Sequence, residues 1–345
     1  MPQRLAQIND WLQNQLQLSN YDIAPASSDA SFRRYFRITA KDKVFSDYQA
    51  GSLIVMDAPP FQEDTGPYIR MAKLLAGVGL NVPLVLEENA EQGFLLLSDL
   101  GSTQYLSILN ANNVEPLYSD ALAALLTLQA QGPREQGELP AYDRSLLQRE
   151  LEIFREWYLQ KHLGLRLSQR QQGIIDNAFA LLIDVALEQP VVCVHRDYHS
   201  RNLMQTDKDN PGILDFQDAV IGPVTYDLVS LLRDCYIAWP REKVESWALS
   251  HKAKLEHAGI IASMDNSQFL RWFDFMGTQR HLKATGIFAR LDQRDGKPEY
   301  LNDIPRTLSY VIDVSGRYDE LQDLNQFLIS IMPSLASQQA QRSDL

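Results

Sequence analysis

The feature that most constrains this chain is a short apolar run that leads directly into closely spaced polar residues. Val191–Val194 predicts a buried strand, and His195-Arg196-Asp197 follows it without a gap. Asn202 comes five positions after Asp197, and Asp215 comes thirteen positions after Asn202, behind a second apolar run. Carboxylate and amide oxygens at the ends of short strands suit the binding of Mg²⁺ and the orienting of a hydroxyl group. The pattern therefore predicts a catalytic loop followed by a metal site.

The spacing matches the H-R-D-x-x-x-x-N loop of the protein-kinase-like fold and the aspartate that opens its D-F-G element. It predicts Asp197 as the catalytic carboxylate beside an acceptor hydroxyl, with Asn202 and Asp215 as Mg²⁺ ligands. His195 is expected to hold the loop through hydrogen bonds. An alternative takes His195, Asp197 and His199 as the transition-metal set of a hydrolase, H-x-D-x-H. That alternative gives Asn202 and Asp215 no role, so it ranks second.

Composition narrows the partners that such a chain can have. A length of 345 residues predicts two domains or one large bilobed domain. The net charge of −12 argues against a nucleic-acid or anionic-membrane partner, because both bind basic surfaces. The two cysteines, Cys193 and Cys235, give no disulfide framework. No signal peptide or membrane-spanning run is expected, so we predict a cytoplasmic protein without an obligate protein partner.

Hydrophobic periodicity predicts an α+β fold, in which a small β-rich lobe precedes a larger, mainly helical lobe. The first lobe is expected over residues 1–98 as an antiparallel sheet, the hinge over 99–103, and the second lobe over 104–345. Strands are expected over 31–39, 52–57, 82–87 and 93–98, helices over 1–18, 68–76, 115–131, 144–162, 168–188, 226–238, 242–258 and 266–291, and polar loops over 131–141 and 292–305.

The stretch from His195 to Asp227 resembles the aminoglycoside phosphotransferase and choline kinase superfamily. There the metal aspartate is followed by D-A-x-x-G-x-P-x-x-D-L, and this chain has Asp218-Ala219 and then Gly222-Pro223-Val224-Thr225-Tyr226-Asp227-Leu228. The order of the two predicted lobes also agrees, over essentially the whole chain. The resemblance implies a bilobed protein-kinase-like fold, ATP and Mg²⁺ as cofactors, and a small molecule as acceptor.

Further segments are similar to one subgroup, the anomeric N-acetylmuramate/N-acetylglucosamine kinases of bacterial cell-wall recycling. They are Ser28–Arg37, Met56–Pro60, and Gln279–Lys283 with Gly286–Arg290. This similarity implies transfer of the ATP γ-phosphoryl group to the anomeric hydroxyl of N-acetylmuramic acid or N-acetylglucosamine. The product is then the 1-phosphate used in peptidoglycan recycling, and Asp197 orients or deprotonates the sugar hydroxyl.

The chain departs from the protein-kinase pattern where a nucleotide binds. It has no G-x-G-x-x-G loop, and the equivalent turn is expected at Ser27–Ser31, where Ser28 and Ser31 are small enough to let backbone N–H groups approach phosphates. Under the resemblance, adenine binds backbone groups of Ser98, Asp99 and Leu100 at the hinge.

A second departure concerns the phosphate-binding lysine of kinases. Met56 stands at its expected position in this chain. Arg33, Arg34 and Arg37 of the neighbouring strand are the candidates for the missing charge. Alternation along a strand puts Arg33 and Arg37 on one face and Arg34 on the other.

The acceptor side is expected on the helical lobe. Sugar hydroxyls are bound by carboxylates or amides, a sugar ring stacks on an aromatic face, and the lactyl carboxylate of N-acetylmuramate asks for arginine. The preferred cluster is Gln279-Arg280-His281-Lys283, whereas Asp218 and Asp227 are expected to be structural. The predicted substrate-binding residues are Glu150, Trp157, His199, Gln217, Arg280 and His281.

Two other functions stay open at this point. A phosphotransferase of the aminoglycoside or choline type would act on another hydroxyl acceptor, and the acidic net charge is compatible with a cationic aminoglycoside. A catalytically inactive, kinase-like binding module is the alternative from another class. The missing lysine is its only support, and the intact Asp197, Asn202 and Asp215 argue against it.

Overall fold

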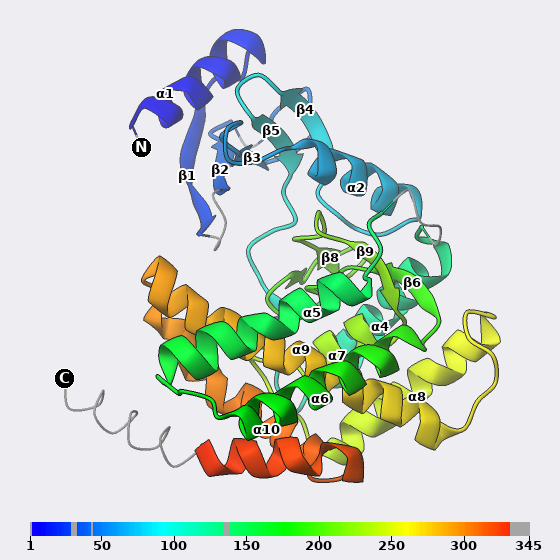
Figure 1. Cartoon of the computed structure of the whole chain (residues 1–345). Helices are drawn as coiled ribbons and strands as arrows, with labels where there is room; N and C mark the ends of the chain where they lie inside the picture. The colour runs from blue at the N-terminus through cyan, green and yellow to red at the C-terminus, as the bar shows by residue number, and fades with distance from the viewer. Residues whose placement is uncertain (1, 29–32, 43, 134–138, 332–345) are drawn as a thin grey trace. The chain divides into compact units, whose positions relative to one another are not determined.

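The chain forms two compact units in a computed structural model, which describes residues 2–28, 33–42, 44–133 and 139–331 (Figure 1). The first unit combines Met1–Thr127 with Arg201–Asp218, and the second combines Leu128–Ser200 with Ala219–Leu345. The predicted boundary at 99–103 stays a prediction, and the compact units divide the chain at other positions.

Residues 201–218 belong to the first unit, and backbone hydrogen bonds connect them to it. Gln205 N–H donates to the carbonyl of Thr103 at 2.8 Å, and Ile213 N–H donates to the carbonyl of Asn81 at 2.8 Å. This segment carries the short hairpin of β7 (Leu203–Met204) and β8 (Gly212–Ile213). The predicted metal ligands Asn202 and Asp215 flank that hairpin.

A five-stranded antiparallel sheet is the centre of the first unit, in the order β1-β2-β3-β5-β4 (Figure 1). The register between β2 and β3 pairs Arg34 with Asp57 and Tyr35 with Met56. The strands are β1 (Tyr21–Ser28), β2 (Arg34–Ala40), β3 (Ser52–Asp57), β4 (Val85–Asn89) and β5 (Phe94–Ser98). The helical segments of this unit are α1 (Pro2–Asp10), η1 (Trp11–Gln15), α2 (Gly66–Gly77) and α3 (Tyr105–Ile108), and α4 (Val114–Gln131) runs from it into the second unit.

The first helix covers one face of this sheet. Ile8, Trp11 and Leu12 are buried against strand residues such as Val55 and Phe94, and the rings of Trp11 and Phe94 lie 5.7 Å apart. Arg4 on α1 donates to the buried carboxylate of Asp57 and, at 2.7 Å, to the carbonyl of Gln92. Apolar packing and a buried ion pair therefore both fix α1 on the sheet.

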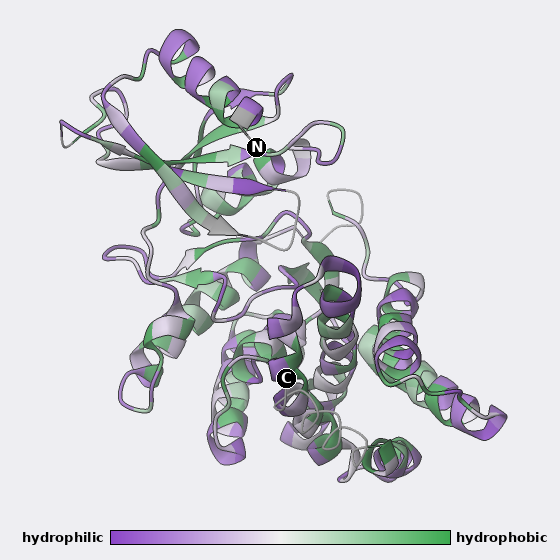
Figure 2. Cartoon of the chain, turned by 90° about the vertical axis from the view of Figure 1, so that its left-hand side faces the viewer, coloured by the Kyte–Doolittle hydropathy of each residue, from purple (hydrophilic) through white to green (hydrophobic). Residues whose placement is uncertain are grey.

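The second unit consists of helices around a small two-stranded sheet of β6 (Val191–Val194) and β9 (Val220–Pro223). Figure 2 shows apolar residues in green on the packed sides of its helices and polar residues in purple on their outer sides. Its helical elements are α5 (Arg144–Ile153), the π-helical η2 (Phe154–His162), α6 (Gln169–Leu187), α7 (Tyr226–Leu232), α8 (Arg241–His257), α9 (Asn266–Asp295), η3 (Pro298–Asp303), α10 (Ile304–Ser315) and η4 (Asp319–Leu321).

The long helix α9 is the central element of the second unit, where it packs against α5, η2, α6, α7, α8 and α10. Its backbone approaches the junction of α5 and η2 closely at Gly286. A Cβ atom added there would lie 2.5 Å from the carbonyl carbon of Ile153 and from the backbone nitrogen of Phe154. Only glycine allows this approach, so the two helices are held at backbone contact.

Most predicted elements are present, and the differences have local causes. The predicted helix over 226–238 ends at Leu232, because the carboxylate of Asp234 accepts the Tyr236 N–H at 2.9 Å and holds the chain in a turn. Strand β1 was not predicted, and η3 and α10 begin inside the polar segment 292–305 that was predicted as a loop. Within the described ranges, no helix has the length and apolar character needed to cross a bilayer.

Candidate active site

The predicted catalytic loop follows β6 in the second unit and is fixed by one buried carboxylate. Asp227, in the first turn of α7, accepts the backbone N–H of His195 at 2.6 Å and that of Arg196 at 3.0 Å. Arg196 adopts a φ of 77°, in the left-handed region that a residue with a side chain seldom occupies. Two hydrogen bonds from backbone N–H groups to the Asp227 side chain therefore stabilise a strained turn just before Asp197.

Asp197 lies among cationic side chains of the same unit. Burial by itself would raise the pKa of the Asp197 carboxyl, but Lys283, His199 and Arg280 lower it, and the lowering is larger. The Asp197 N–H donates to His195 Nδ1 at 3.3 Å, so the histidine ring supports the loop as predicted. The site therefore contains an ionised carboxylate that can accept a hydrogen bond from a substrate hydroxyl.

A buried network centred on Glu150 anchors two of the neighbouring cations. The Glu150 carboxylate accepts hydrogen bonds from Arg196 and Tyr142, and it pairs with Lys283 Nζ at 2.9 Å. Lys283 Nζ also donates to the Tyr226 hydroxyl at 3.1 Å. Glu150 thus has three partners within the protein, and its predicted role in substrate binding stays a prediction.

The predicted metal ligands lie together in the first unit. Asn202 Nδ2 donates to Asp215 Oδ2 at 3.4 Å, and the Asn202 carbonyl accepts the Leu214 N–H at 2.9 Å. Gln217 Nε2 donates to Asp215 Oδ1 at 2.9 Å. Asp215 has a φ of 64°, which costs about 1–3 kcal/mol for a residue other than glycine and is typical of functional sites. One carboxylate flanked by two amides is a donor set that fits Mg²⁺.

Of the three candidate arginines, Arg33 is the one that shares a neighbouring residue, Tyr68, with Asp215. Arg33 Nε donates to Glu63 Oε2 at 3.2 Å. Tyr68 on α2 connects the two, because its ring lies 4.9 Å from that of Phe216, and the charges of Arg33 and Asp215 both act on its hydroxyl. Burial is the main reason why the pKa of Tyr68 is raised well above its ordinary value.

Arg34 and Arg37 have structural partners elsewhere in the first unit. Arg34 donates to the Asp57 carboxylate that also binds Arg4. Arg37 binds Asp99 through two nitrogens, at 2.6 and 3.0 Å, and donates to the carbonyl of Gly101 at 2.8 Å.

The predicted hinge is held by hydrogen bonds within the first unit. Ser52 Oγ donates to Asp99 at 2.7 Å, and the Ser98 hydroxyl accepts the Leu84 N–H at 2.8 Å. Leu100 packs against Gly212, where an added Cβ atom would lie 2.9 Å from its Cδ1. Of the phosphate-turn residues, Ser28 ends β1 opposite Arg34, and Ser31 lies outside the described residues.

The predicted acceptor residues of the second unit fall into two groups. Arg280 and His199 act electrostatically on Asp197, whereas Trp157 and His281 have other partners. The ring of Trp157 is covered by Lys161 Nζ at 3.4 Å. His281 Nε2 lies 2.8 Å from the carbonyl oxygen of Arg233, and burial is the main cause that lowers the pKa of its ring to about 3. Gln217 belongs to the first unit and contacts Asp215.

The alternative metal set of a hydrolase does not assemble. His195 Nδ1 accepts the backbone N–H of Asp197, and among the described residues no three His, Cys, Asp or Glu side chains are placed to hold a metal ion. The sequence reasoning also missed Asp234, whose carboxylate accepts the N–H and the hydroxyl of Ser200 and so holds the end of the loop. Its position directly after an apolar helix was the available signal.

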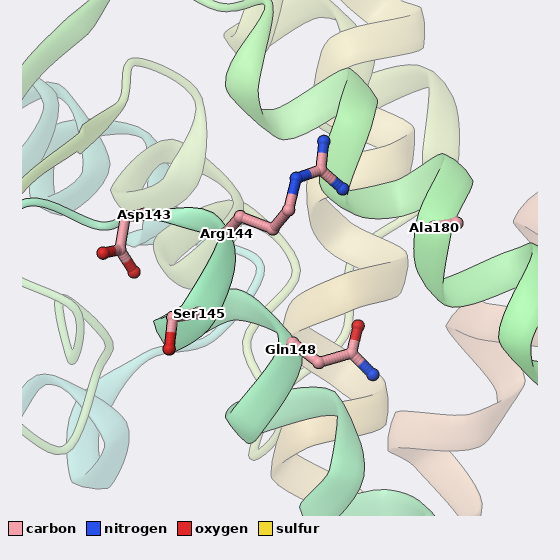
Figure 3. Close-up of a pocket in the computed structure, with 5 residues that line it drawn as sticks. All are labelled: Asp143, Arg144, Ser145, Gln148 and Ala180. Atoms are coloured by element: carbon pink, nitrogen blue, oxygen red, sulfur yellow. The ribbon is translucent and has the colours of Figure 1, made fainter.

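A surface depression of about 570 Å³ lies apart from these residues, between the start of α5 and α6 (Figure 3). Arg144 there pairs with Asp184, and both side chains are more than half exposed. Its lining residues are Asp143, Arg144, Ser145, Gln148 and Ala180, none of which was predicted as a site residue.

A protein-family model and several named relatives match most of this chain. Residues 22–265 match the model of the phosphotransferase enzyme family. The N-acetylmuramate/N-acetylglucosamine kinase of Pseudomonas putida is 45% identical over 95% of this chain and 96% of its own length. The N-acetylmuramate/N-acetylglucosamine kinase of Neisseria meningitidis serogroup B is 42% identical over 96% of each chain.

Solved structures show the same fold at low sequence identity. Plasmodium vivax ethanolamine kinase matches with a TM-score of 0.62 at 11% identity, over 88% of this chain and 86% of its own. Choline kinase from Cryptosporidium parvum matches with a TM-score of 0.62 at 12% identity, over 96% and 99%. The predicted α+β, protein-kinase-like fold and the resemblance to the aminoglycoside phosphotransferase and choline kinase superfamily are confirmed.

Proposed function

This chain belongs to the phosphotransferase enzyme family, and we propose that it phosphorylates the anomeric hydroxyl of N-acetylmuramic acid and N-acetylglucosamine with ATP. One observation carries the proposal: relatives named for these two sugars are 42–45% identical over nearly the whole chain. The 1-phosphate product fits a role in the recycling of cell-wall sugars.

Asp197 is the proposed catalytic residue. As the sugar hydroxyl attacks the γ-phosphorus, its proton passes to an Asp197 oxygen, and the bond from the γ-phosphorus to the bridging oxygen breaks with its electron pair staying on ADP. The ionised state of Asp197, which Lys283 and Arg280 favour against the effect of burial, supports this role. The fixed loop conformation supports it as well, because phosphoryl transfer depends mainly on positioning.

Asn202 and Asp215 would hold Mg²⁺, with Gln217 orienting the Asp215 carboxylate. When bound, the ion would neutralise charge on the phosphates of ATP. The backbone at Ser98, Asp99 and Leu100 is the proposed contact for adenine, and Ser28 and Ser31 border the proposed phosphate turn.

Arg33 is the proposed replacement for the missing lysine. Its ion pair with Glu63 resembles in kind the lysine–glutamate pair of kinases, and it shares the neighbourhood of Tyr68 with Asp215. Arg34 and Arg37 are already used to hold Asp57 and Asp99. With Arg33 in this role the chain has a basic group for phosphate, which weakens the case for an inactive binding module that rests on the missing lysine.

The test is ADP release from Mg·ATP with N-acetylmuramate, N-acetylglucosamine, glucosamine, choline and kanamycin as acceptors, followed by phosphorus NMR of the product. We expect an anomeric phosphate from the two N-acetyl sugars alone. Asp197→Asn should lower kcat by about 10²–10⁴-fold with ATP affinity nearly unchanged. Asp184→Asn, at an exposed ion pair of α6, is the matched control. Turnover of choline or kanamycin instead of the sugars would refute the proposal.

A further inference from the structure

Helix α9 carries an unusual run of buried polar residues where it passes the catalytic loop. Arg280 is 5% exposed and Lys283 is 8% exposed. The two positions are three residues apart, so their Cβ atoms share one face of the helix about 5–6 Å apart. Both side chains act electrostatically on Asp197. This face of α9 therefore supplies the positive charge around the catalytic carboxylate.

Lys283 is committed to the protein, but the guanidinium of Arg280 has only a weak partner. Its Nη1 lies 3.5 Å from the Cys235 thiol, and its buried Nε has no hydrogen-bond partner. Among the described residues, no carboxylate forms an ion pair with Arg280. Asp234 lies in the same neighbourhood, but its oxygens accept the N–H and hydroxyl of Ser200 and the N–H of Tyr236.

Arg233, in the same unit, is a buried arginine that forms an ion pair within the protein. It is 4% exposed and pairs with Asp274 Oδ1 at 2.5 Å. A buried cation without such a partner is strongly unfavourable, so proteins pair nearly all of them. The charges of Asp197 and Asp234 act on Arg280, but neither forms with it the ion pair that Arg233 has with Asp274, which leaves its guanidinium nitrogens able to bind an anion beside Asp197.

We propose that Arg280 binds the carboxylate of the acceptor, and so selects N-acetylmuramate over N-acetylglucosamine. This inference rests on the proposed function. The lactyl group of N-acetylmuramate is attached to C3, two carbons from the anomeric centre, so a sugar whose reacting hydroxyl meets Asp197 carries its carboxylate only a few bonds away. N-Acetylglucosamine has no carboxylate, and the guanidinium fork suits a bidentate contact that lysine cannot reproduce.

The experiment compares kcat/KM for the two sugars in wild type, Arg280→Gln and Arg280→Lys. We expect Arg280→Gln to lower kcat/KM for N-acetylmuramate by about 10–100-fold more than kcat/KM for N-acetylglucosamine, with the extra loss mostly in KM, because the charge that Arg280 exerts on Asp197 is lost for both sugars alike. Arg280→Lys should restore part of the loss. Arg271→Gln is the matched control, because Arg271 lies on the same helix and pairs with the exposed Glu188 and Glu320.

Calorimetric titration of N-acetylmuramate gives a second readout that does not depend on turnover, and thermal unfolding monitors folding of each variant. An equal loss for both sugars in Arg280→Gln overturns the inference, since it indicates a structural or phosphate-directed role. Wild type that binds Mg·ATP but phosphorylates neither sugar overturns the proposed function, and the inference with it. Selective loss on N-acetylmuramate, in activity and in binding, supports it.

Discussion

Replacing Glu150 with glutamine tests whether the second unit depends on a buried balance of charge. The Glu150 side chain is 4% exposed and holds both Arg196 and Lys283. Glutamine keeps the size of the side chain and one acceptor oxygen but removes the negative charge. Arg196 and Lys283, whose side chains are 20% and 10% exposed, then lose their shared counter-charge with little water to replace it.

The expected loss in the free energy of unfolding is about 3–4 kcal/mol at neutral pH. Removing one partner of a buried ion pair costs about 3–5 kcal/mol, because the other charge stays buried. The amide oxygen of glutamine still accepts one of the lost hydrogen bonds, each worth about 1.5–3 kcal/mol when charged, so the lower part of that range applies.

The loss should depend on pH in a defined direction. Burial alone would raise the pKa of Glu150, but Lys283 and Arg196 bring it below its ordinary value of 4.5. The stabilisation by the carboxylate is therefore present above the pKa of the unfolded chain and disappears as the pH falls through the lowered pKa of the folded state. The difference between wild type and Glu150→Gln should narrow as the pH falls below about 4.5.

Urea unfolding, followed by circular dichroism and tryptophan fluorescence from pH 7 to pH 3.5, measures this difference. Glu152→Gln is the matched control on the same helix, because the Glu152 side chain is 40% exposed and forms its ion pair with Arg155 at 3.2 Å near the surface. We expect the control to lose less than about 1 kcal/mol. A Glu150→Gln loss no larger than the control at pH 7, or a difference that widens as the pH falls, would refute the reasoning.

The remaining predictions concern backbone contacts and a second buried carboxylate. Gly286→Ala should cost about 1–3 kcal/mol in urea unfolding, because its Cβ meets the backbone of Ile153 and Phe154 at 2.5 Å. Gly173→Ala, with open space around its helical position, should gain up to about 1 kcal/mol, and the reverse order would contradict both expectations. Burial raises the pKa of Asp227 to about 7, although the hydrogen bonds from the His195 and Arg196 N–H groups act to lower it. The contribution of this group to the free energy of unfolding is therefore complete at low pH and is lost as the pH rises through about 7. Between pH 4 and 7 the free energy of unfolding of Asp227→Asn should therefore vary less than that of wild type. Parallel pH profiles for variant and wild type would contradict the raised pKa of Asp227.

The sequence predicted what depends on local spacing. The apolar run at Val191–Val194 predicted strand β6, the intervals along the chain predicted that Asn202 and Asp215 lie together, and helical periodicity located most of the helices. These signals are local because the alternation of a strand and the period of a helix depend on residues that are close together in the sequence.

The ion-pair partners of charged side chains could not be predicted from the sequence in the same way. Arg33, Arg34 and Arg37 each bind a different carboxylate, and those carboxylates come from distant segments. The same holds for Glu150, whose ion pairs with Arg196 and Lys283 could not be read from the sequence and whose predicted contact with substrate stays a prediction. Tertiary contacts decide such roles, and one sequence does not encode them in its local pattern.

The docking of α1 on the sheet has a consequence for the order in which this chain is made. Trp11, at the start of the adjoining η1, contacts Phe94, which is added to the growing chain more than 80 residues later. At about 5–20 residues per second, the first helix exists for roughly 4–16 s before its partner strand is synthesised. The helix is thus made well before the strand on which it packs, and its apolar side chains stay exposed to solvent through that interval.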